Sequence, residues 1–428
     1  MRVQLHPRAL ALLAHLALAA PLFGDSASEG REARNLHRRF DYDHDKIRGV
    51  NLGGWFVIEP FLTPTLFNNT GNPAIVDEWT FCQLQDRETA ESALRHHWDT
   101  FITADDFVEI AAAGLDHVRI PVGYWMLDVE GTEPYIQGSE EFLDRAIGWA
   151  QENGIQVLID LHGAPGSQNG NDHSGHLGPI DWPHDPVYVD RTVEVIRTLA
   201  AKYGSPPYSD TVTMIELLNE PAISVSDEMA KVTKQYYLDA YEAARWPWGR
   251  EAGNQTDLII VFHDGFRELM YWDGFLTGDG FEKVWIDDHY YQVFGVRDAN
   301  VTAEQHIRRV CEEQNNFATS PFPSISGEFS IYVPPCTPAE RHSALGNVGT
   351  CDKSEPNGET DYATFTQAYF DLQVELFENV GQGRGWFYYT WKSEDWEEWS
   401  YKTSRVLGWI PFRPWEHHFH LNTVCAAA

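Results

Sequence analysis

The order of hydrophobic and polar residues along the chain predicts strands that alternate with helices. Eight apolar runs of four to seven residues have the length of buried strands: Ile47–Leu52, His117–Pro121, Gln156–Leu161, Thr213–Asn219, Leu258–His263, Val284–His289, Ser324–Gly327 and Gly385–Trp391. Between these runs the apolar spacing changes to that of helices. One helix is predicted from Ser139, a candidate N-cap, to Gly154, and another from Thr103 to Gly114.

This alternation predicts an α/β fold, a (β/α)8 TIM barrel formed by a single domain with enlarged loops. Eight strands spread over roughly 380 residues fit the known size of such barrels, which run from about 200 to over 400 residues. No internal repeat, low-complexity tract or interdomain linker follows Arg39.

The first 39 residues differ in character from the rest. Arg2 and Arg8 precede the apolar run 9–20, and residues 17–19 are small enough for a cleavage site, so residues 1–19 are predicted to be a signal peptide. Residues 20–39 are a candidate pro-segment that ends at Arg38-Arg39, although a disordered linker with a chance Arg-Arg explains them equally well. The domain is expected to span residues 40–428. The predicted location is secreted, extracellular or in the cell wall.

Composition narrows the class of partner. The chain has 64 acidic and 31 basic residues, a formal charge of -33, which repels nucleic acid and anionic lipid and suits a neutral or cationic partner. No run after the N-terminus has membrane-spanning length, so neither nucleic acid nor a membrane is an expected partner. Sixteen Trp and eighteen Tyr could stack on sugar rings, but most aromatic residues in any protein belong to its core.

In an oxidising compartment the five cysteines predict disulfides. Four of them lie in the C-terminal third and suggest two bridges, with Cys82 left over; the pairing stays open among Cys311, Cys336, Cys351 and Cys425. Three Asn-x-Thr sites, at Asn68, Asn254 and Asn300, are compatible with a glycoprotein, and each also occurs readily by chance.

Polar side chains gather where the predicted strands end. In chain order they are Glu59, Arg119, His162, Asp172, Asn219, Glu220, His289, Tyr291, Glu328 and Trp391. The carboxyl ends of barrel strands meet at one rim, where such enzymes carry their catalytic groups. Each of these residues alone could be a satisfied structural group, but buried polar groups are costly unless they are paired, so the whole set favours a site. Glu220 and Glu328 there suggest glycoside hydrolysis.

Several longer stretches carry a family resemblance. They are Arg48-Gly49-Val50-Asn51-Leu52-Gly53-Gly54-Trp55, Val118-Arg119-Ile120-Pro121-Val122-Gly123-Tyr124-Trp125, Leu161-His162-Gly163-Ala164-Pro165-Gly166-Ser167-Gln168-Asn169-Gly170, Leu218-Asn219-Glu220-Pro221, His289-Tyr290-Tyr291-Gln292-Val293-Phe294 and Gly327-Glu328-Phe329. With these stretches, from residue 40 to about 425, the chain resembles glycoside hydrolase family 5, and more closely its fungal exo-β-1,3-glucanases.

The resemblance implies a reaction and two catalytic roles. It implies release of glucose from non-reducing ends of β-1,3-glucans by double displacement with retained configuration, with transglycosylation as a further outcome, and carboxyl groups roughly 5 to 5.5 Å apart. Glu220 is then the acid/base, for which we expect a raised pKa. Glu328 is the nucleophile, kept ionised by Arg119 and the Tyr291 hydroxyl.

The resemblance also implies a set of substrate-binding residues: Glu59, Arg119, His162, Asp172, Asn219, His289, Tyr291, Phe294 and Trp391. Asn219 is expected to bind the sugar 2-OH, and Trp391 to stack under the sugar ring. Glu59 and Asp172 are expected to close the pocket around the terminal glucose, which confines the enzyme to chain ends. The implied partner is a β-glucan polysaccharide or oligosaccharide, and we expect a monomer.

Two positions depart from the pattern that the resemblance implies. Asn171 stands where an aromatic partner of Phe294 is expected, and His173 where an Asn is expected. The departure leaves the leaving-group side open, so a β-1,6-glucanase, or a β-glucosidase or rutinosidase of the same family, remains an alternative. A non-catalytic β-glucan-binding cell-wall protein is a further alternative, which the presence of both carboxylates disfavours.

No cofactor or metal is expected. The loop residues Asp172, His173, His176, Asp181, His184 and Asp185 match no ligand spacing, and His417, His418 and His420 are interpreted as surface residues. Glu216 is assigned to the other face of its strand, as a structural partner between barrel and helices.

Overall fold

The eight predicted strands form one closed parallel barrel in the computed structural model, which describes residues 40–427 except 295–300, 335–347 and 354–357. The strands are β1 (Ile47–Asn51), β2 (His117–Gly123), β3 (Gln156–Gly163), β4 (Val212–Glu216), β5 (Ile259–His263), β6 (Val284–Tyr290), β7 (Ser324–Phe329) and β8 (Gly383–Tyr388). Each pairs in parallel with the next, and β8 pairs with β1. The predicted TIM barrel is therefore confirmed.

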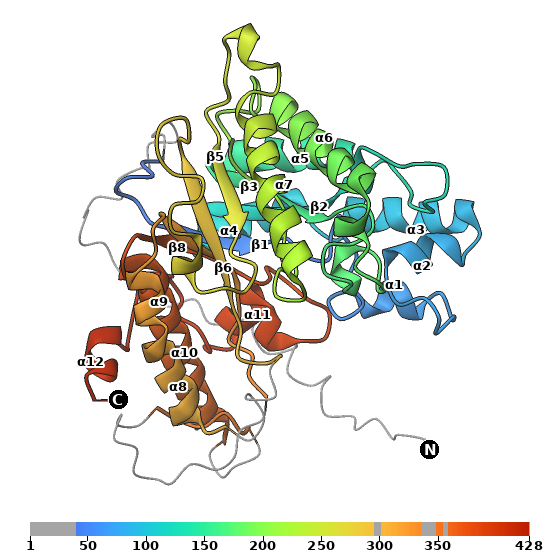
Figure 1. The fold of residues 1–428 in the computed structure, drawn as a ribbon. Coiled ribbons are helices and arrows are strands. Elements are labelled where there is room, and N and C mark those ends of the chain that lie inside the picture. The colour runs from blue at the N-terminus through green and yellow to red at the C-terminus, as the bar shows by residue number, and fades with distance from the viewer. Residues whose placement is uncertain (1–39, 295–300, 335–347, 354–357, 428) are drawn as a thin grey trace, which may run out of the picture. The chain divides into compact units, whose positions relative to one another are not determined.

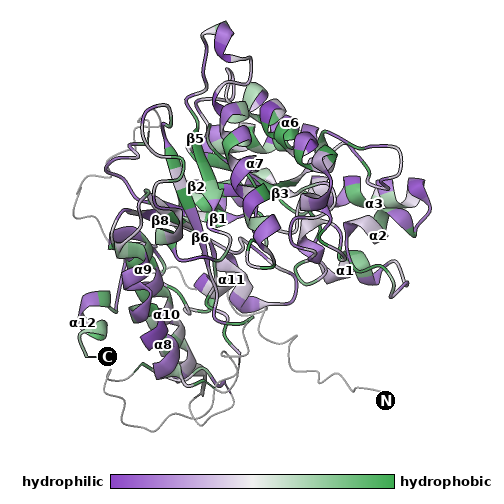
Figure 2. Ribbon diagram, viewed as in Figure 1, coloured by the Kyte–Doolittle hydropathy of each residue, from purple (hydrophilic) through white to green (hydrophobic). Residues whose placement is uncertain are grey.

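Helices connect the strands around the barrel (Figure 1). They are α1 (Pro64–Asn68), α2 (Glu78–Gln83), α3 (Arg87–Thr100), α4 (Ala104–Ala113), α5 (Glu140–Asn153), α6 (Pro186–Tyr203), α7 (Asp227–Arg245), α8 (Ala303–Glu312), α9 (Gln314–Ala318), α10 (Gly358–Asn379), α11 (Tyr401–Val406) and α12 (Leu421–Cys425). In Figure 2 the helices carry both green and purple stretches, whereas strands such as β5 are mainly green, as expected for helices with one buried face.

The predicted ends of two helices are confirmed, whereas the bounds of two strands differ from the prediction. Gly154 ends α5 with a φ of 68°, and Gly114 ends α4 with a φ of 91°, the left-handed conformation that glycine adopts without strain. Ser139 does precede α5, but its side chain makes no capping hydrogen bond. β4 ends at Glu216 rather than at Asn219, and β8 spans Gly383–Tyr388 rather than 385–391.

The barrel interior has two layers. At the N-terminal ends of the strands an apolar cluster fills it, with Phe40 and Tyr42 packed against the cluster: Ile47, Leu158, Met214, Ile259, Val261, Trp285, Ile325 and Phe387. Because side chains alternate between the faces of a strand, the next inward position lies two residues further along. At that position β3, β4 and β6 carry Asp160, Glu216 and Asp287.

Gly327 makes room for one of these carboxylates. A Cβ atom at Gly327 would lie 1.8 Å from Asp287 Oδ2, so no larger residue fits without displacing Asp287. The Gly327 N–H also donates to Asp287 Oδ1. Gly327, which has no side chain to pack in the strand, therefore provides both the space and a hydrogen bond for the buried Asp287 carboxylate.

One disulfide, Cys311–Cys425, joins α8 to α12. Cys351 is also disulfide-bonded, Cys336 lies outside the described residues, and Cys82 is free and buried, as predicted. Asn68 and Asn254 are exposed, whereas Asn300 lies outside the described residues. Among the described helices we find none with the length and apolar character needed to cross a bilayer.

Candidate active site

Arg119 lies at the centre of the site. It is fully buried on β2, and its Nη1 donates to Glu328 Oε1 at 2.8 Å. Its Nε donates to Glu216 Oε2 at 2.8 Å, and its Nη2 donates to Asn219 Oδ1 at 2.8 Å and lies 3.1 Å from Asp160. Burial alone would lower the pKa of Arg119, but the surrounding carboxylates raise it well above its usual value. One guanidinium thus pairs with carboxylates from three strands.

The prediction for Glu216 was wrong. Its side chain is buried inside the barrel, where it accepts the hydrogen bond from Arg119, and does not lie between the barrel and the helices. Burial raises the pKa of Glu216 well above its usual value; Arg119 acts against this, and the charge of Asp287 adds to it. Glu216 therefore belongs to the charged network beneath the site.

Glu220 follows β4 at a strained backbone position. Its φ is 46°, in the left-handed region that residues other than glycine rarely adopt, and such strain is concentrated at functional sites. The side chain is nearly buried, with Oε1 2.7 Å from His289 Nδ1 and Oε2 3.5 Å from His173 Nε2. A histidine of β6 and a histidine of the segment after β3 therefore flank the carboxylate.

The pKa of Glu220 corrects a second expectation. Burial raises it, but the hydrogen bond from His289 and the charge of His173 outweigh burial, so the pKa of Glu220 lies well below its usual value. Burial would lower the pKa of His289, yet the charges of Glu328 and Asp287 raise it well above its usual value. Both shifts therefore favour His289 as the holder of the proton in this pair.

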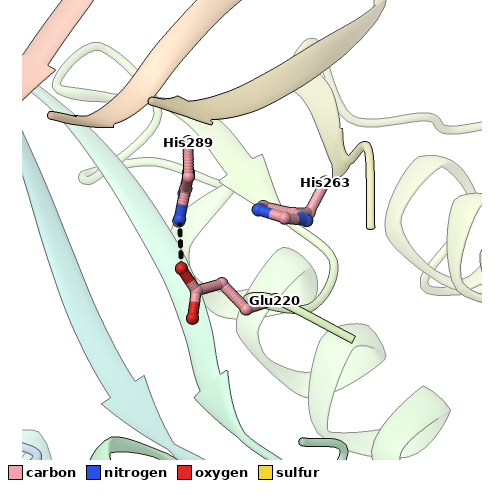
Figure 3. Close-up of side chains that lie close together, drawn as sticks. All are labelled: Glu220, His263 and His289. Atoms are coloured by element: carbon pink, nitrogen blue, oxygen red, sulfur yellow. Dashed lines mark hydrogen bonds and ion pairs between the residues drawn. The ribbon is translucent and has the colours of Figure 1, made fainter. Parts of the chain in front are cut away.

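Figure 3 shows His289 joined to Glu220 by this hydrogen bond, with His263 beside them. The His263 and His289 rings are 4.3 Å apart and nearly perpendicular. His263 Nδ1 accepts the Gly265 N–H at 2.8 Å, so the ring's own proton belongs on Nε2. Burial, followed by the charge of His289, lowers the pKa of His263 well below its usual value. One histidine of the pair is a cation and the other is neutral.

Glu328, at the end of β7, is held through both oxygens. Arg119 donates to Oε1, and the Tyr291 hydroxyl donates to Oε2 at 3.0 Å. His289 Nδ1 lies 3.6 Å from Oε2, so the same nitrogen faces both candidate catalytic carboxylates. The contacts predicted for Glu328 are confirmed.

Glu59 is paired with a residue that the sequence did not single out. Its Oε1 accepts the Gly54 N–H at 2.9 Å and the hydroxyl of Tyr389. The pKa of Glu59 is raised to about 7, mainly by burial; the charges of Glu328 and Asp172 contribute to the rise, whereas His162 and Tyr389 act against it. Tyr389 directly follows β8, so its place at the rim could have been inferred from strand alternation.

Trp391 does not lie where the resemblance placed it. Its ring is 2% exposed, and its Nε1 donates to Asp106 Oδ1 on α4 at 2.9 Å. The ring packs nearly parallel to Tyr401, with centroids 6.3 Å apart. A side chain held in this way cannot stack under a sugar. Tyr389 is also buried, but its hydroxyl contacts Glu59 of the site, whereas Trp391 contacts α4.

Three other expected residues do face the centre of the site. His162 Nδ1 lies 2.6 Å from Asp160 Oδ2; burial alone would lower the pKa of His162, and Asp160 raises it. Asp172 acts electrostatically on Glu59 from the loop after β3. Asn219 is fully buried, and its Nδ2 has no protein partner among the described residues, which leaves a donor for a ligand.

The residues beyond the pocket are more exposed. Phe294 is 77% exposed and packs edge-on against Tyr291, with centroids 5.5 Å apart. Asn171 is exposed, and its N–H donates to its neighbour Asn169.

Within the described residues, two groups come close enough to hold a metal ion: Glu220, His263 and His289, and Glu216, Asp287 and His289. Both share His289, whose two nitrogens already face Glu220 and Asp287. The loop histidines 173, 176 and 184 belong to neither group.

Sequence reasoning missed Asn51, Asp160, His263, Asp287 and Tyr389 as members of the site. A signal was available for three of them, of which Tyr389 is described above. Asp160 and Asp287 each lie two residues before an expected site histidine, so both must point to the same face of their strand. Asn51 lies in one of the stretches that carry the resemblance but was given no role; its Oδ1 accepts from Arg119 at 2.9 Å.

Known proteins resemble this chain in sequence and in fold. The family model for cellulase (glycosyl hydrolase family 5) matches residues 68–329. A glucan 1,3-beta-glucosidase of Blumeria graminis is 37% identical over 95% of each chain, and one of Candida oleophila is 38% identical over 87% of this chain and 90% of its own. Among solved structures, the rutinosidase from Aspergillus niger covers 86% of this chain and 99% of its own with a TM-score of 0.71 at 20% identity.

Proposed function

The chain belongs to glycoside hydrolase family 5, and from that premise we propose that it is a retaining exo-β-1,3-glucanase that releases glucose from the non-reducing ends of β-1,3-glucans. The relatives named glucan 1,3-beta-glucosidase support the linkage and the substrate. The observation that carries the mechanism is that one nitrogen, His289 Nδ1, lies 2.7 Å from Glu220 and 3.6 Å from Glu328.

This geometry bears on the stereochemistry. The Glu220 and Glu328 oxygens that face His289 Nδ1 can be no further apart than the sum of their distances to that nitrogen. This sum is below the roughly 6.5 to 9.5 Å that separates the two carboxyl groups in inverting enzymes. This separation leaves less room for a water between nucleophile and sugar than inverting enzymes have. The short separation supports double displacement, in which Glu328 itself attacks the anomeric carbon.

In the first step a Glu328 oxygen bonds to the anomeric carbon while the glycosidic C–O bond breaks, and Glu220 gives its proton to the leaving oxygen. In the second step Glu220 takes a proton from water, the resulting hydroxide bonds to the anomeric carbon, and Glu328 leaves. Because the two pKa shifts favour the proton on His289, its hydrogen bond to Glu220 is the route by which the acid is loaded.

Binding of the terminal glucose rests on the groups left free at the rim. Asn219 Nδ2 is available for the 2-OH, where a hydrogen bond strengthens as charge develops in the transition state. Glu59 uses one oxygen for Tyr389 and Gly54 and keeps the other for a sugar hydroxyl. Tyr389, rather than Trp391, is the candidate aromatic surface next to the sugar.

The test is product analysis on laminarin followed by NMR. We expect glucose to appear first as the β-anomer, whereas first release of the α-anomer would overturn the assigned mechanism. Activity on pustulan or on a flavonoid rutinoside in place of laminarin would move the function to the alternatives within the family.

Azide separates the two roles. With added azide, Glu328→Ala should yield α-glucosyl azide, because azide attacks in place of the lost nucleophile. Glu220→Ala should yield β-glucosyl azide, because the enzyme-bound intermediate still forms on activated glucosides. Glu228→Gln, an exposed carboxylate on α7, is the matched control and should behave as wild type. The same anomer from both variants would contradict the assignment.

The proposal has three further parts. Residues 1–19 are a secretory signal, the chain is cleaved after Arg39, and the enzyme also catalyses transglycosylation. N-terminal sequencing of protein from a culture medium tests the first two: a start at Phe40 supports both. A start at residue 20 would remove the pro-segment from the proposal.

A further inference from the structure

Five aromatic side chains form a strip beside the catalytic carboxylates. The strip consists of Phe61, Phe294, Tyr332, Trp396 and Trp399. They come from the segments after β1, β6, β7 and β8, so four separate loops contribute rings to the same rim. The proposed chemistry uses none of the three that follow β7 and β8.

Trp399 joins the strip together. Its ring centroid lies 5.5 Å from that of Phe61, 5.9 Å from that of Tyr332 and 6.3 Å from that of Phe294. Trp396 continues the strip through Tyr332, at 6.0 Å. Rings at these separations are in packing contact, so the strip is continuous.

The inner end of the strip reaches the catalytic site. Trp399 is 5.4 Å from Tyr291, whose hydroxyl donates to Glu328, and 6.4 Å from Tyr389, whose hydroxyl donates to Glu59. A ligand that leaves the pocket along this side would pass directly onto the rings.

The rings around Trp399 are more exposed than Trp399 itself. Trp399 is 6% exposed, Phe61 36%, Trp396 45% and Phe294 77%. Contiguous exposed apolar surface on a soluble protein marks an interaction site, and single scattered rings do not. In an enzyme that takes one terminal sugar, the exposed surface that borders the site contacts the part of the substrate that remains outside.

Hydrogen bonds hold the strip in place. The Glu394 N–H donates to Leu62 O at 2.9 Å, and the Thr65 N–H donates to Glu394 Oε2 at 2.8 Å, which ties the segments carrying Phe61 and Trp396 together. The Ser393 hydroxyl donates to Trp396 O at 2.6 Å. The rings are therefore presented on a fixed backbone.

We infer that this strip binds the leaving glucan chain, at glucosyl units beyond the one next to the cleaved bond, and so makes the enzyme favour long β-1,3-glucans over disaccharides. The inference rests on the proposed function. Pyranose rings have apolar faces that pack on aromatic side chains, and they are neutral, whereas the chain's charge of -33 opposes anionic partners. Because the strip is continuous with the residues that contact Glu328 and Glu59, we assign it to the substrate rather than to a separate binding partner.

The test compares Trp396→Ala and Phe61→Ala with wild type on laminarihexaose, laminaribiose and p-nitrophenyl β-glucoside. We expect kcat/KM on the hexaose to fall about five- to tenfold for each variant, with less than about a twofold change on the other two substrates. The control is Trp248→Ala: this ring has the same 45% exposure as Trp396 but follows α7, away from the strip, and its loss should change nothing.

Three outcomes would overturn the inference. Equal losses on all substrates would make the rings structural supports of the pocket, and no loss on the hexaose would show that the strip is not used. A larger loss on the p-nitrophenyl glucoside would assign the strip to an aromatic leaving group. Failure of the proposed function is visible separately, because wild type would then cleave p-nitrophenyl β-glucoside but not laminarihexaose.

Discussion

The two layers of the barrel interior are built from the same strands and have opposite chemistry. On β3, β4 and β6 one inward step changes the side chain from apolar to acidic: Leu158 to Asp160, Met214 to Glu216, and Trp285 to Asp287. The apolar layer is held by volume and contact, which many hydrophobic side chains could supply. The charged layer is held by Arg119, which few substitutions could replace.

The difference between the two layers predicts which substitutions affect this protein most. A buried charge without its partner costs more than a buried cavity, because no water reaches it to compensate. We therefore expect the charged layer to control both stability and activity, and the apolar layer to control stability alone. Four substitutions test this expectation, from the largest effect to the smallest.

Arg119→Met should have the largest effect. Loss of the guanidinium leaves buried carboxylates uncompensated, which should lower the free energy of unfolding at pH 7 by about 3 to 5 kcal/mol and abolish most activity. Burial favours the protonated form of carboxyl groups left without a cation, so the deficit should shrink at pH 5. Urea unfolding at both pH values measures it. A variant as stable as wild type at pH 7 would contradict the comparison.

Met214→Ala should break the apolar layer without changing the chemistry. Truncation in a packed core costs about 2 to 5 kcal/mol, so we expect a loss near 3 kcal/mol with kcat per folded molecule unchanged. Met214→Leu, which nearly conserves volume, is the control and should cost less than about 1.5 kcal/mol. The two layers would not be separable if kcat of Met214→Ala fell as far as that of Arg119→Met.

Glu59→Gln should remove a pH dependence. The pKa of Glu59 is raised to about 7 in the folded protein from the ordinary value of 4.5, so between these values the folded state holds a proton that the unfolded state has lost. Wild-type stability should therefore fall as the pH rises from 4.5 to 7, by on the order of 2 kcal/mol from this group. The amide cannot ionise and should flatten that part of the curve. An unchanged slope in the variant would show that Glu59 does not cause it.

His173→Asn should have the smallest effect. His173 Nε2 lies 3.5 Å from Glu220, and its charge lowers the pKa of Glu220 together with the hydrogen bond from His289. Because Glu220 must be protonated to act as the acid, the basic limb of the kcat/KM profile should move to higher pH in the variant. His173 is partly buried and its contact with Glu220 is long, so we expect the contact to be worth under about 1 kcal/mol and rates to change less than about fivefold.

His176→Asn is the matched control for that profile. His176 lies in the same loop but stacks on Trp79 at 4.3 Å. Its replacement should leave the basic limb where it is. If the basic limb shifts in His176→Asn, or does not shift in His173→Asn, then His173 does not control the pKa of Glu220.

Much of the site could be predicted because strand alternation and strand ends are local properties. Glu220, Glu328, Arg119, Asn219 and Tyr291 were expected at the rim from their positions at strand ends and from the family motifs, and the structure brings them together. The pKa of Glu220 could not be predicted in this way. Its direction depends on His289, which lies 69 residues away in the chain and 2.7 Å away in space.

The sequence by itself determined the barrel, the eight strands and the pair of carboxylates, because hydrophobic period and motif spacing are written along the chain. Only the tertiary structure decided which neighbour each polar group meets. It put Glu216 on Arg119, Tyr389 on Glu59 and Trp391 on Asp106. The reason is physical: closing the barrel brings distant strands side by side, and burial then makes the contacts between them decide charge and orientation.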